Sequence, residues 1–367
     1  MKVAFRADAS LHIGSGHVMR CLTLAEELRA QGAQCHFISR AHPGNLMEVI
    51  RQRGFTVNSL PEPVKHGQEA IKKIAPAHSH WLGSTWQADA QETCAVLASL
   101  QPDWLVVDHY ALDQRWEDSV AADRHHLMVI DDLADRPHRC DLLLDQNLGR
   151  QPQDYAALVP THCQVLTGPS YALLRSEFSA LRPYSFQRRK AQPALRQLLI
   201  SMGGVDPDNA TGRVLQALKA SVLPADCQIT VVLGLTAPWL ENVRELATHM
   251  PWPTEVVVNV NDMARRMAES DLAIGAAGST SWERCCLGLP TLMVVLAENQ
   301  MPGAYAMVAA QAASLIGNVS DIATHLPLAV AELIEPECSS RMSVAASAIT
   351  DGHGVVRVAR AMEFTHV

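Results

Sequence analysis

The sequence predicts an α/β protein of two doubly wound halves, and three observations support this fold class. Short apolar segments alternate with helical patterns, as expected for parallel sheets that helices cover on both faces. The order of strand, glycine-rich turn and helix opens the chain and begins again after residue 196. With 367 residues, the chain is longer than a typical domain with a single hydrophobic core. We therefore expect two domains that face a central, ligand-binding cleft.

The first segment, residues 2–31, has the clearest strand, turn and helix pattern. Val3 and Phe5 alternate with smaller or polar neighbours, and apolar residues recur at helical spacing between residues 18 and 28. The turn Gly14-Ser15-Gly16-His17 lies between the two patterns. It brings backbone N–H groups and the positive end of a helix dipole to one point, which suits a phosphate group. The segment is therefore a candidate anion site with a titratable side chain beside it.

Further elements follow in the first half. Residues 104–108 form a buried strand pattern that ends in polar residues, a common position for ligand contacts in an open α/β sheet. The polar segment 61–80 predicts a helix with surface loops. Residues 181–193 are rich in Arg, Lys and Pro, which predicts a linker between domains of residues 1–180 and 194–367. The other predicted elements are strands at 34–39, 55–57, 127–131, 141–145 and 164–167 and helices at 46–53, 88–100 and 112–122.

The second half repeats the same pattern. A strand at 197–201 leads into the turn Gly203-Gly204, and a helix at 209–220 follows with Asn209 as its N-cap. A strand at 271–274 leads into a second glycine-rich turn at 275–280, which a helix at 281–287 follows. The other predicted elements are strands at 229–233, 255–258 and 291–296 and helices at 262–270, 305–313 and 351–362.

Composition excludes several classes of protein. Hydrophobic residues make up 48% of the chain and charged residues 19%, as in ordered globular proteins. The formal net charge of −8 argues against a partner that is nucleic acid or an anionic membrane, because both need a basic face. The sequence contains no signal-peptide pattern and no apolar run of about 18 residues. We expect a cytoplasmic protein without membrane insertion.

Cysteine and histidine spacing gives no metal signature. The nine cysteines include no CxxC pair, and we expect reduced, mostly buried thiols. The 16 histidines lack an HExxH motif or another close metal-ligand spacing. We therefore expect neither a metal nor another cofactor.

The first glycine turn does not match the known nucleotide fingerprints. A G-x-G-x-x-G motif requires glycine at position 19, where the chain has Met19, and no acidic residue closes the second strand. A G-x-x-x-x-G-K-[ST] loop is also absent from the sequence. Taken alone, the turn fits ordinary packing as well as it fits ligand binding.

His17 has two interpretations. A histidine at a helix start is most often structural. The positive end of this helix disfavours imidazolium, so we expect a neutral ring at pH 7 that can accept a proton. Beside a bound diphosphate, such a ring can deprotonate water. The position therefore makes His17 the candidate general base.

The second half offers better candidates for binding a diphosphate. Its two glycine turns lie at the carboxyl ends of predicted strands, where open α/β sheets bind ligands. Gly278-Ser279-Thr280 combines two hydroxyls with backbone N–H groups. Glu283, one helical turn further on, can accept hydrogen bonds from both hydroxyls of a ribose. The alternative is that the turns serve packing and that Glu283 is a solvated helix residue.

Four acidic residues raise the possibility of a metal site or a carboxylate pair. They follow predicted strands at Asp108, Asp131, Asp132 and Asp145. Glycoside hydrolysis usually needs two carboxylates because an alcohol leaves poorly without a proton. The spacing selects no pair, and we expect most of these residues to cap helices or to bond loops.

Six motifs in one order carry a resemblance to a known family. The chain resembles the nucleotide-sugar hydrolases of pseudaminic acid biosynthesis, the UDP-2,4-diacetamido-2,4,6-trideoxy-β-L-altropyranose hydrolases. That family is similar in fold to the GT-B glycosyltransferases. Residues 61–90 and 318–350 match no part of it. The motifs are Arg6-Ala-Asp8, Ile13-Gly-Ser-Gly-His17, Asp108-His-Tyr110, Gly168-Pro-Ser-Tyr-Ala-Leu-Leu-Arg175, Ser201-Met-Gly-Gly-Val-Asp206 and Glu298-Asn299-Gln300.

The resemblance implies a GT-B-like fold of two Rossmann-like domains and a reaction. The implied reaction is metal-independent hydrolysis of the glycosidic C–O bond with inversion, which releases UDP and the free sugar. His17 matches the catalytic histidine, Tyr110 an active-site tyrosine, and Glu283 and Asn299 positions that hold nucleotide and substrate. The expected binding residues are Asp8, Gly14, Gly16, Tyr110, Tyr171, Arg175, Gly203, Gly204, Gly278, Ser279, Thr280, Glu283, Asn299 and Gln300.

The chemistry of the residues is consistent with this reaction. UDP is a good leaving group, so its departure needs charge stabilisation more than a strong general acid. One base that activates water then suffices. Two alternatives stay open, a GT-B glycosyltransferase with the same donor and a non-catalytic protein that binds nucleotide sugars. We expect a monomer whose partner is the UDP-sugar.

Overall fold

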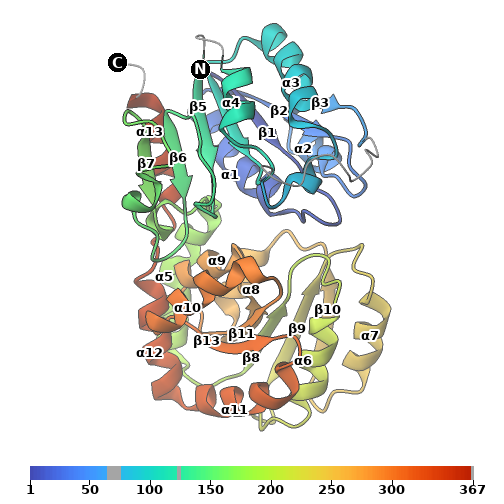
Figure 1. Ribbon diagram of the computed structural model, residues 1–367. Coiled ribbons are helices and arrows are strands. Elements are labelled where there is room, and N and C mark those ends of the chain that lie inside the picture. Colours follow the sequence, from blue (N-terminus) through green and yellow to red (C-terminus); the bar gives the residue numbers. More distant parts are fainter. Residues whose placement is uncertain (64–75, 122–124, 365–367) are drawn as a thin grey trace. The chain divides into compact units, whose positions relative to one another are not determined.

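The computed structural model describes residues 1–63, 76–121 and 125–364, and it divides into two compact units (Figure 1). Unit 1 is Met1–Leu173 together with the segment from Gly354 onward, and unit 2 is Leu174–His353. Each unit is built on one parallel sheet, so the predicted fold class is confirmed. The helix predicted within residues 61–80 falls mainly on residues 64–75, which lie outside the described residues.

Unit 1 contains a seven-stranded sheet of order β3-β2-β1-β4-β5-β6-β7, in which each pair of adjacent strands is parallel. The order reverses at β1, because β2 and β3 lie on one side of it and β4 on the other. Open parallel sheets bind ligands at such a switch point. The strands are β1 (Lys2–Ala7), β2 (Gln34–Arg40), β3 (Thr56–Leu60), β4 (Trp104–Asp108), β5 (His126–Ile130), β6 (Leu142–Asp145) and β7 (Gln164–Thr167).

Helices cover both faces of this sheet. The alternation predicted for β1 is confirmed, since Val3 and Phe5 enter one core cluster and Ala4 enters the other. Phe5 stacks on Phe37 with ring centroids 5.0 Å apart. The helices are α1 (Gly16–Ala30), α2 (Met47–Gln52), α3 (Trp86–Leu100), α4 (Gln114–Val120) and α13 (Gly354–Phe364), with short 3-10 turns η1 (Ser79–Leu82), η2 (Pro152–Tyr155) and η3 (Pro169–Tyr171).

A buried ion network joins α3 and α4 to the sheet. Arg6 is fully buried and donates to Asp8 Oδ1 at 2.7 Å and to Asp89 Oδ2 at 2.7 Å. Arg40 also donates to Asp89 Oδ2 at 2.7 Å, and the indole of Trp116 donates to Asp89 Oδ1 at 3.0 Å. Burial alone raises the pKa of Asp89, but the charge of Arg6 outweighs it and holds this pKa below its usual value.

Unit 2 contains a six-stranded parallel sheet of order β10-β9-β8-β11-β12-β13. Its switch point is β8, which lies between β9 and β11. Asn209 caps α6 as predicted, with its side chain accepting from the Gly212 N–H. The strands are β8 (Gln197–Ser201), β9 (Gln228–Leu233), β10 (Thr254–Val258), β11 (Leu272–Ala276), β12 (Thr291–Val295) and β13 (Ser314–Asn318).

The helices of unit 2 include several that the sequence did not predict. A 3-10 turn, η4 (Glu298–Gln300), precedes α10. The segment 318–350, which matched no motif, contains the whole of α11 and α12. The helices are α5 (Ser176–Ala191), α6 (Ala210–Leu218), α7 (Leu240–Thr248), α8 (Met263–Glu269), α9 (Thr280–Cys286), α10 (Met301–Ala309), α11 (Ile322–Ile334) and α12 (Pro336–Ser347).

The predicted linker at 181–193 is wrong, because most of these residues belong to α5. The basic side chains that suggested a linker bind the body of unit 2. Arg188 donates to Asp271 Oδ1 at 2.5 Å, and Arg189 donates to the carbonyl of Ser270 at 2.9 Å. Pro183 lies inside the helix. Basic composition therefore reflected carbonyl and carboxylate contacts and not an exposed connection.

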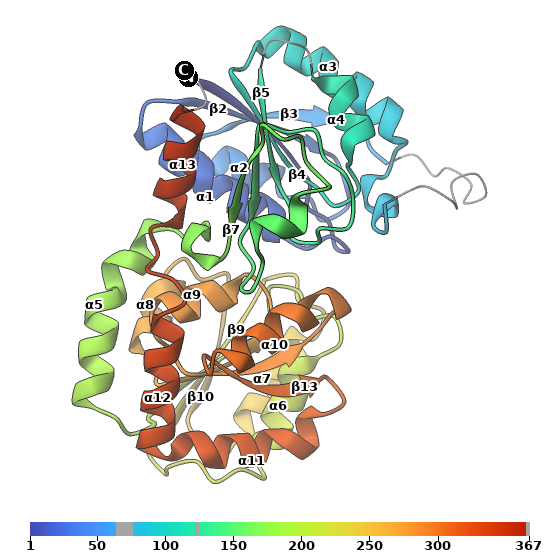
Figure 2. The same ribbon diagram turned by 60° about the vertical axis from the view of Figure 1, so that its left-hand side comes forward.

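The predicted domain bounds also differ from the observed units. The first unit ends at residue 173, not 180, and the last helix belongs to unit 1. Helix α13 lies beside α1 (Figure 2), and its residues Val355, Val358 and Met362 are in the same core cluster as β1. The physical reason is burial, because the apolar face of α13 completes the core on that side of the seven-stranded sheet.

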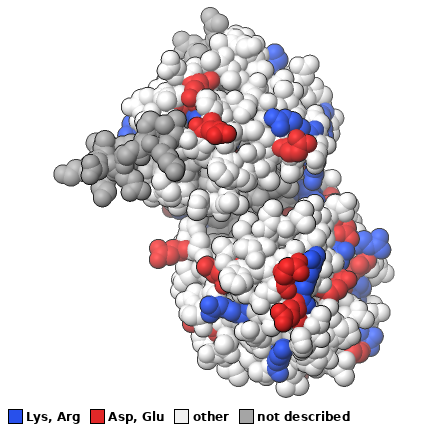
Figure 3. Space-filling model, turned by 90° about the vertical axis from the view of Figure 1, so that its right-hand side faces the viewer, with Lys and Arg blue, Asp and Glu red and all other residues white. Residues whose placement is uncertain are grey.

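The surface carries charges of both signs. On the described part of the face in Figure 3, basic and acidic side chains are interspersed, so the net charge of −8 is not concentrated there. Within the described ranges, no helix has the length and apolar character needed to cross a bilayer. The cytoplasmic location stays a prediction.

Two glycines at the switch point of unit 2 make a matched test of packing. A Cβ added to Gly234 would meet the backbone oxygen of Gly204, which accepts the Gly234 N–H at 2.9 Å, whereas a Cβ on Gly204 meets nothing within 4 Å. We expect Gly234→Ala to destabilise the protein by about 1–3 kcal/mol, the usual cost of overpacking. Gly204→Ala is the control, and we expect little change. Urea unfolding of both variants checks this, and equal stabilities would contradict it.

Candidate active site

The candidate site of unit 1 lies at the switch point of its sheet. The segment after β1 and the start of α1 carry Gly14, Gly16 and His17, and the segment after β4 carries Tyr110. Because β1 and β4 are adjacent parallel strands, their carboxyl ends bring these residues together. Gly14 has φ of 79° and closes a turn onto the carbonyl of Ser10 at 2.9 Å. This turn directs the chain into α1.

His17 is held by Asp108, the last residue of β4. Its Nδ1 lies 2.6 Å from Asp108 Oδ1, and the histidine is 7% exposed. In a neutral ring, this contact requires the proton on Nδ1, because a carboxylate can only accept. Nε2 is then the unprotonated nitrogen. A carboxylate that fixes the tautomer and orientation of a histidine is the arrangement of a general base.

Arg20, one helical turn after His17, completes the contacts of Asp108. Its Nε donates to Oδ2 at 2.6 Å and its Nη2 to Oδ1 at 2.7 Å. Its Nη1 reaches Asp132 Oδ2 at 2.6 Å. Burial alone raises the pKa of Asp108, but the charges of Arg20 and His17 outweigh it and hold this pKa well below the usual range. Asp108 is therefore ionised at neutral pH.

Tyr110 lies against His17 and belongs to the same network. Its hydroxyl donates to Asp132 Oδ2 at 2.5 Å. Its ring meets that of His17 edge to face, with centroids 4.5 Å apart. Burial raises the pKa of Tyr110 well above its ordinary value, and the charge of Asp132 adds to this. Tyr110 therefore stays protonated.

Two aromatic neighbours were missed in the sequence. Trp81, in η1, stacks on Tyr110 with centroids 5.7 Å apart and lies 6.2 Å from the ring of His17. The His78 ring lies 4.4 Å from the ring of Trp81. Both belong to the segment that matched no motif. The available signal was their composition, two histidines and a tryptophan within residues 78–81.

Asp8, expected to bind substrate, is enclosed by protein groups. It is fully buried, and its Oδ1 accepts from Arg6 at 2.7 Å and from the backbone N–H of Arg40 at 2.7 Å. The Nε2 atoms of His42 and His109 lie 3.5 and 3.3 Å from Oδ2. These contacts stabilise the end of β1, and a direct ligand contact of Asp8 stays a prediction.

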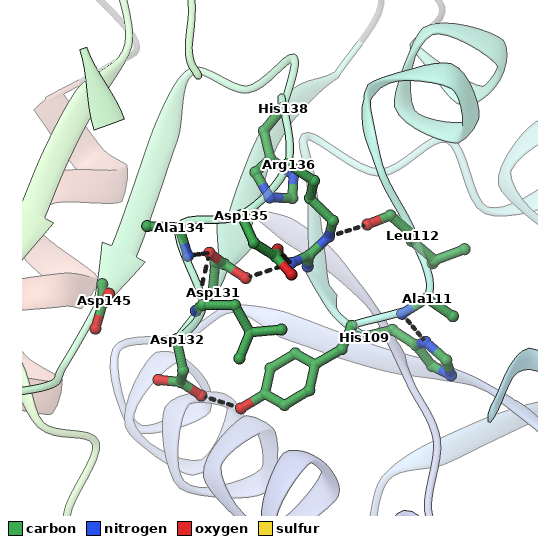
Figure 4. Close-up of polar contacts among 12 residues, drawn as sticks. His109, Ala111, Leu112, Asp131, Asp132, Ala134, Asp135, Arg136, His138 and Asp145 are labelled. Atoms are coloured by element: carbon green, nitrogen blue, oxygen red, sulfur yellow. Dashed lines mark hydrogen bonds and ion pairs between the residues drawn. The ribbon is translucent and has the colours of Figure 1, made fainter. Parts of the chain in front are cut away.

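The other acidic residues form a second network. Asp131 accepts from the backbone N–H of Ala134 at 2.8 Å and pairs with Arg136 at 2.8 Å (Figure 4). The prediction that such residues bond loops is confirmed here. The Tyr155 hydroxyl lies 2.9 Å from Asp131 Oδ2 and 2.8 Å from Asp145 Oδ2. One hydroxyl proton serves only one of these contacts, so the other needs a proton on a carboxyl group.

Below about pH 6, Asp145 is the group that carries this proton. Burial raises its pKa to about 6, and the nearby charge of Asp132 adds to the effect. Its donors, Arg150 and the backbone N–H of Asn147, oppose the shift without cancelling it. Asp145 therefore titrates close to neutral pH, beside the carboxylate that binds Tyr110 and Arg20.

The candidate nucleotide site of unit 2 lies at the carboxyl ends of β8 and β11, which are adjacent. Gly203 and Gly204 follow β8, and a Cβ on either would meet nothing within 4 Å. Gly278, Ser279 and Thr280 form the turn between β11 and α9. This edge therefore brings together the two glycine turns that the sequence indicated.

Four more of the expected binding residues lie outside these two glycine turns. Arg175 pairs with Glu177 at 2.8 Å near the start of α5. The side-chain oxygen of Gln300 accepts the backbone N–H of Leu296 at 2.9 Å, which holds the loop before α10. Asn299 is exposed in the same loop. Tyr171 belongs to unit 1, where it packs against the core cluster that contains β1.

Glu283 is poised to change its charge near neutral pH. Burial raises its pKa to about 7, although the charges of Arg175 and Arg284 lower it in part.

No three His, Cys, Asp or Glu side chains of the described ranges are grouped so that they can hold a metal ion. Metal independence of the reaction stays a prediction.

The fold defines the class of protein: the chain has the GT-B fold. MurG of Acinetobacter baumannii superposes with a TM-score of 0.70 at 16% identity, covering 99% of both chains. UDP-GlcNAc 2-epimerase of Neisseria meningitidis, bound to UDP-GlcNAc, gives a TM-score of 0.58 at 13% identity and covers 100% of both. At these identities the likeness shows the fold alone.

The sequence comparison is more specific. The chain is 26% identical over 302 residues to the UDP-2,4-diacetamido-2,4,6-trideoxy-beta-L-altropyranose hydrolase of Campylobacter jejuni, covering 82% of this chain and 93% of that protein. This similarity confirms the resemblance indicated by the six motifs. No protein-family model matches the chain.

This chain spans a smaller share of two other relatives. An uncharacterized protein of Methanocaldococcus jannaschii is 25% identical over 305 residues, 82% of this chain, and the chain spans 56% of that protein. The spore coat polysaccharide biosynthesis protein SpsG of Bacillus subtilis is 30% identical over 143 residues, which are 39% of this chain and 40% of SpsG.

The elevated pKa of Asp145 predicts a pH-dependent stability. Because the folded chain binds this proton more tightly than the unfolded chain, the contribution is complete below about pH 4 and is lost as the pH rises through about 6. Relative to wild type, we expect Asp145→Asn to gain on the order of 2–3 kcal/mol of unfolding free energy between about pH 4 and pH 8.

Urea unfolding at several pH values measures this difference. Asp118→Asn is the control, because Asp118 is exposed and pairs with the exposed Arg139. Its profile should run parallel to that of the wild type. A parallel profile for Asp145→Asn would contradict the assignment of the proton.

Proposed function

We propose that this protein is an enzyme that hydrolyses the glycosidic C–O bond of a UDP-activated 2,4-diacetamido-2,4,6-trideoxy sugar, with inversion. The products are UDP and the free sugar. The similarity over 82% of the chain to a hydrolase named for this substrate supports the reaction. The observation that carries the proposal is the contact of His17 with Asp108 at 2.6 Å, which leaves Nε2 as a base.

In the proposed step, His17 Nε2 accepts a proton from water while the water oxygen bonds to the anomeric carbon. The bond from that carbon to the UDP oxygen breaks, and UDP leaves with the electron pair. Inversion follows because water attacks from the face opposite the leaving group. Asp108 stabilises the imidazolium that forms, since its carboxylate stays ionised beside Nδ1.

The leaving group explains why one base suffices. UDP departs as a stable anion, so protonation by a second carboxylic acid is not required. In unit 2, the proposed sites for the diphosphate are the turns at Gly203-Gly204 and at residues 278–280. Preorganised N–H groups and hydroxyls there stabilise charge that develops as the bond breaks. Glu283 is the proposed acceptor for the ribose hydroxyls.

A glycosyltransferase is the second candidate function. The GT-B fold is consistent with it, because one solved structure of this fold is named a rhamnosyltransferase. Purified protein incubated with the UDP-sugar and no acceptor separates the two functions. Hydrolysis predicts release of UDP and one anomer of the free sugar, seen by NMR. Release of UDP only after an acceptor is added would support the transferase.

Substitution of His17 tests the proposed base. We expect His17→Ala to lower turnover about 10²–10⁴-fold, the usual contribution of a positioned base, with UDP affinity unchanged. His12→Ala is the control, because His12 is exposed in the same loop. Initial rates and calorimetric titration with UDP measure the two effects. Turnover of His17→Ala close to that of His12→Ala would remove His17 from the mechanism.

The elevated pKa of Glu283 predicts how nucleoside binding depends on pH. Only the carboxylate accepts from both ribose hydroxyls, and this group ionises as the pH rises through about 7. We expect the affinity for uridine, a ligand without phosphate, to rise about tenfold between about pH 6 and pH 8.

Two variants complete this test. Glu283→Gln should bind uridine weakly at every pH, whereas the exposed Glu337→Gln should keep the wild-type profile. NMR titration gives the affinities. A flat profile for the wild type would contradict the ribose assignment.

A further inference from the structure

Arg284 is a buried cation at the candidate nucleotide site. It lies in α9 and is 2% exposed. Its Nη2 donates to the carbonyl of Ala276 at 2.7 Å and to the hydroxyl of Ser281 at 3.0 Å, and its Nη1 donates to the hydroxyl of Thr280 at 3.2 Å. These acceptors are all uncharged, and all lie on the connection between β11 and the first turn of α9. The guanidinium therefore lies directly beneath this turn.

The charge of Arg284 is not balanced by an ion pair. Among the described residues, no carboxylate lies within ion-pair distance of it, and its buried Nε has no hydrogen-bond partner. In unit 1, by contrast, the buried Arg6, Arg20 and Arg40 each pair with at least one carboxylate. Burial lowers the pKa of Arg284 to about 10, which leaves it charged at neutral pH. A buried charge without a partner is costly, so an anion nearby would stabilise it.

The chain makes room for this guanidinium. A Cβ added to Gly275, in β11, would lie 2.5 Å from Arg284 Nη1. Only glycine leaves this space, because the strand backbone itself cannot move away. The sequence analysis included Gly275 in a glycine turn that is a candidate for binding a diphosphate. At Gly275, the approaching group is instead a side chain of the protein.

The turn above Arg284 has free donors on its accessible side. The backbone N–H groups of Gly278 and Ser279 make no hydrogen bond to the described residues. A Cβ on Gly278 would meet only Gln300 Nε2, at 3.8 Å, and Ser279 is exposed. An anion can therefore approach these N–H groups from outside while the guanidinium lies on the inner side of the turn.

We propose that Arg284 is a positioning residue that shapes the turn at residues 276–281 and adds positive potential there, so that this turn binds the diphosphate of a nucleoside diphosphate. The proposal rests on the proposed function, because it takes the nucleotide to bind in unit 2. It goes further in naming an electrostatic contribution from a side chain that does not touch the ligand. Such a contribution acts more strongly on the phosphates than on the uncharged nucleoside.

The test compares a charged and an uncharged ligand. Calorimetric titration or NMR gives the affinities of wild type and Arg284→Met for UDP and for uridine. We expect Arg284→Met to weaken UDP binding about ten- to thirtyfold at low salt, as expected for one unit charge at partial screening. Uridine binding should weaken less than UDP binding, because the charge of Arg284 acts on the nucleoside only through the pKa of Glu283, which it lowers. Arg284→Lys, which keeps the charge, should restore part of the loss for UDP.

A matched control separates charge from folding. Arg182 donates to the backbone carbonyls of Cys286, Ser347 and Thr350 in unit 2. Arg182→Met therefore removes a cation and its carbonyl contacts away from the turn. We expect the ratio of UDP to uridine affinity to stay at its wild-type value in this variant. If Arg284→Met does not fold, Arg284→Lys and Gly275→Ala, which displaces the guanidinium, carry the same comparison.

Two results would overturn the inference. One is an equal loss of UDP and uridine binding in the Arg284 variants, which indicates a structural role alone. The other is an unchanged ratio of the two affinities. Failure of the proposed function looks different, because the wild type itself would then bind UDP no better than uridine or release no UDP from the sugar nucleotide.

Discussion

The carboxylate of Asp108 is the contact on which the candidate active site depends. Three nitrogen atoms from α1 meet it, His17 Nδ1 and the Nε and Nη2 of Arg20, at 2.6 to 2.7 Å. These contacts hold the first turn of α1 against the end of β4. They also fix which nitrogen of the imidazole is bound, Nδ1, and leave Nε2 away from this carboxylate. Arg20 also donates to Asp132, and Asp132 in turn accepts the hydroxyl of Tyr110. The position of Tyr110 therefore depends on the carboxylate of Asp108 as well.

The two units treat buried charge differently, and this difference separates a framework from a ligand site. In unit 1, buried guanidinium groups meet carboxylates, as Arg6 meets Asp89 and Arg20 meets Asp108, so their charges are paired. In unit 2, Arg284 meets only neutral oxygens, and burial leaves Glu283 with a pKa of about 7. Unbalanced buried groups cost stability. Arg284 and Glu283 both lie on α9. We expect such a pair of groups at a binding site, where a ligand with phosphate charges and sugar hydroxyls stabilises them.

Local patterns predicted most of the fold, and failures had identifiable causes. The strands of both sheets gave clear apolar runs because parallel strands are buried on both faces. The segment 181–193 was predicted to be a linker because it is rich in Arg, Lys and Pro, yet Arg188 and Arg189 bind Asp271 and backbone carbonyls. The last helix was assigned to the second half by its place in the chain. Its apolar face packs instead with α1 in unit 1, a choice made by burial and not by chain order.

The sequence by itself determined most of the strand and helix order, the glycine turns and the histidine at the start of α1, because each depends on backbone preferences and periodicity over a few residues. Only the tertiary structure decided the partners. Asp108 is 91 residues from His17, and the pairing of β1 with β4 brings them together. Gly275 had the pattern of a ligand turn, but its missing side chain makes space for Arg284. Charge pairing and close packing act through space between distant segments, and periodicity does not encode which segments meet.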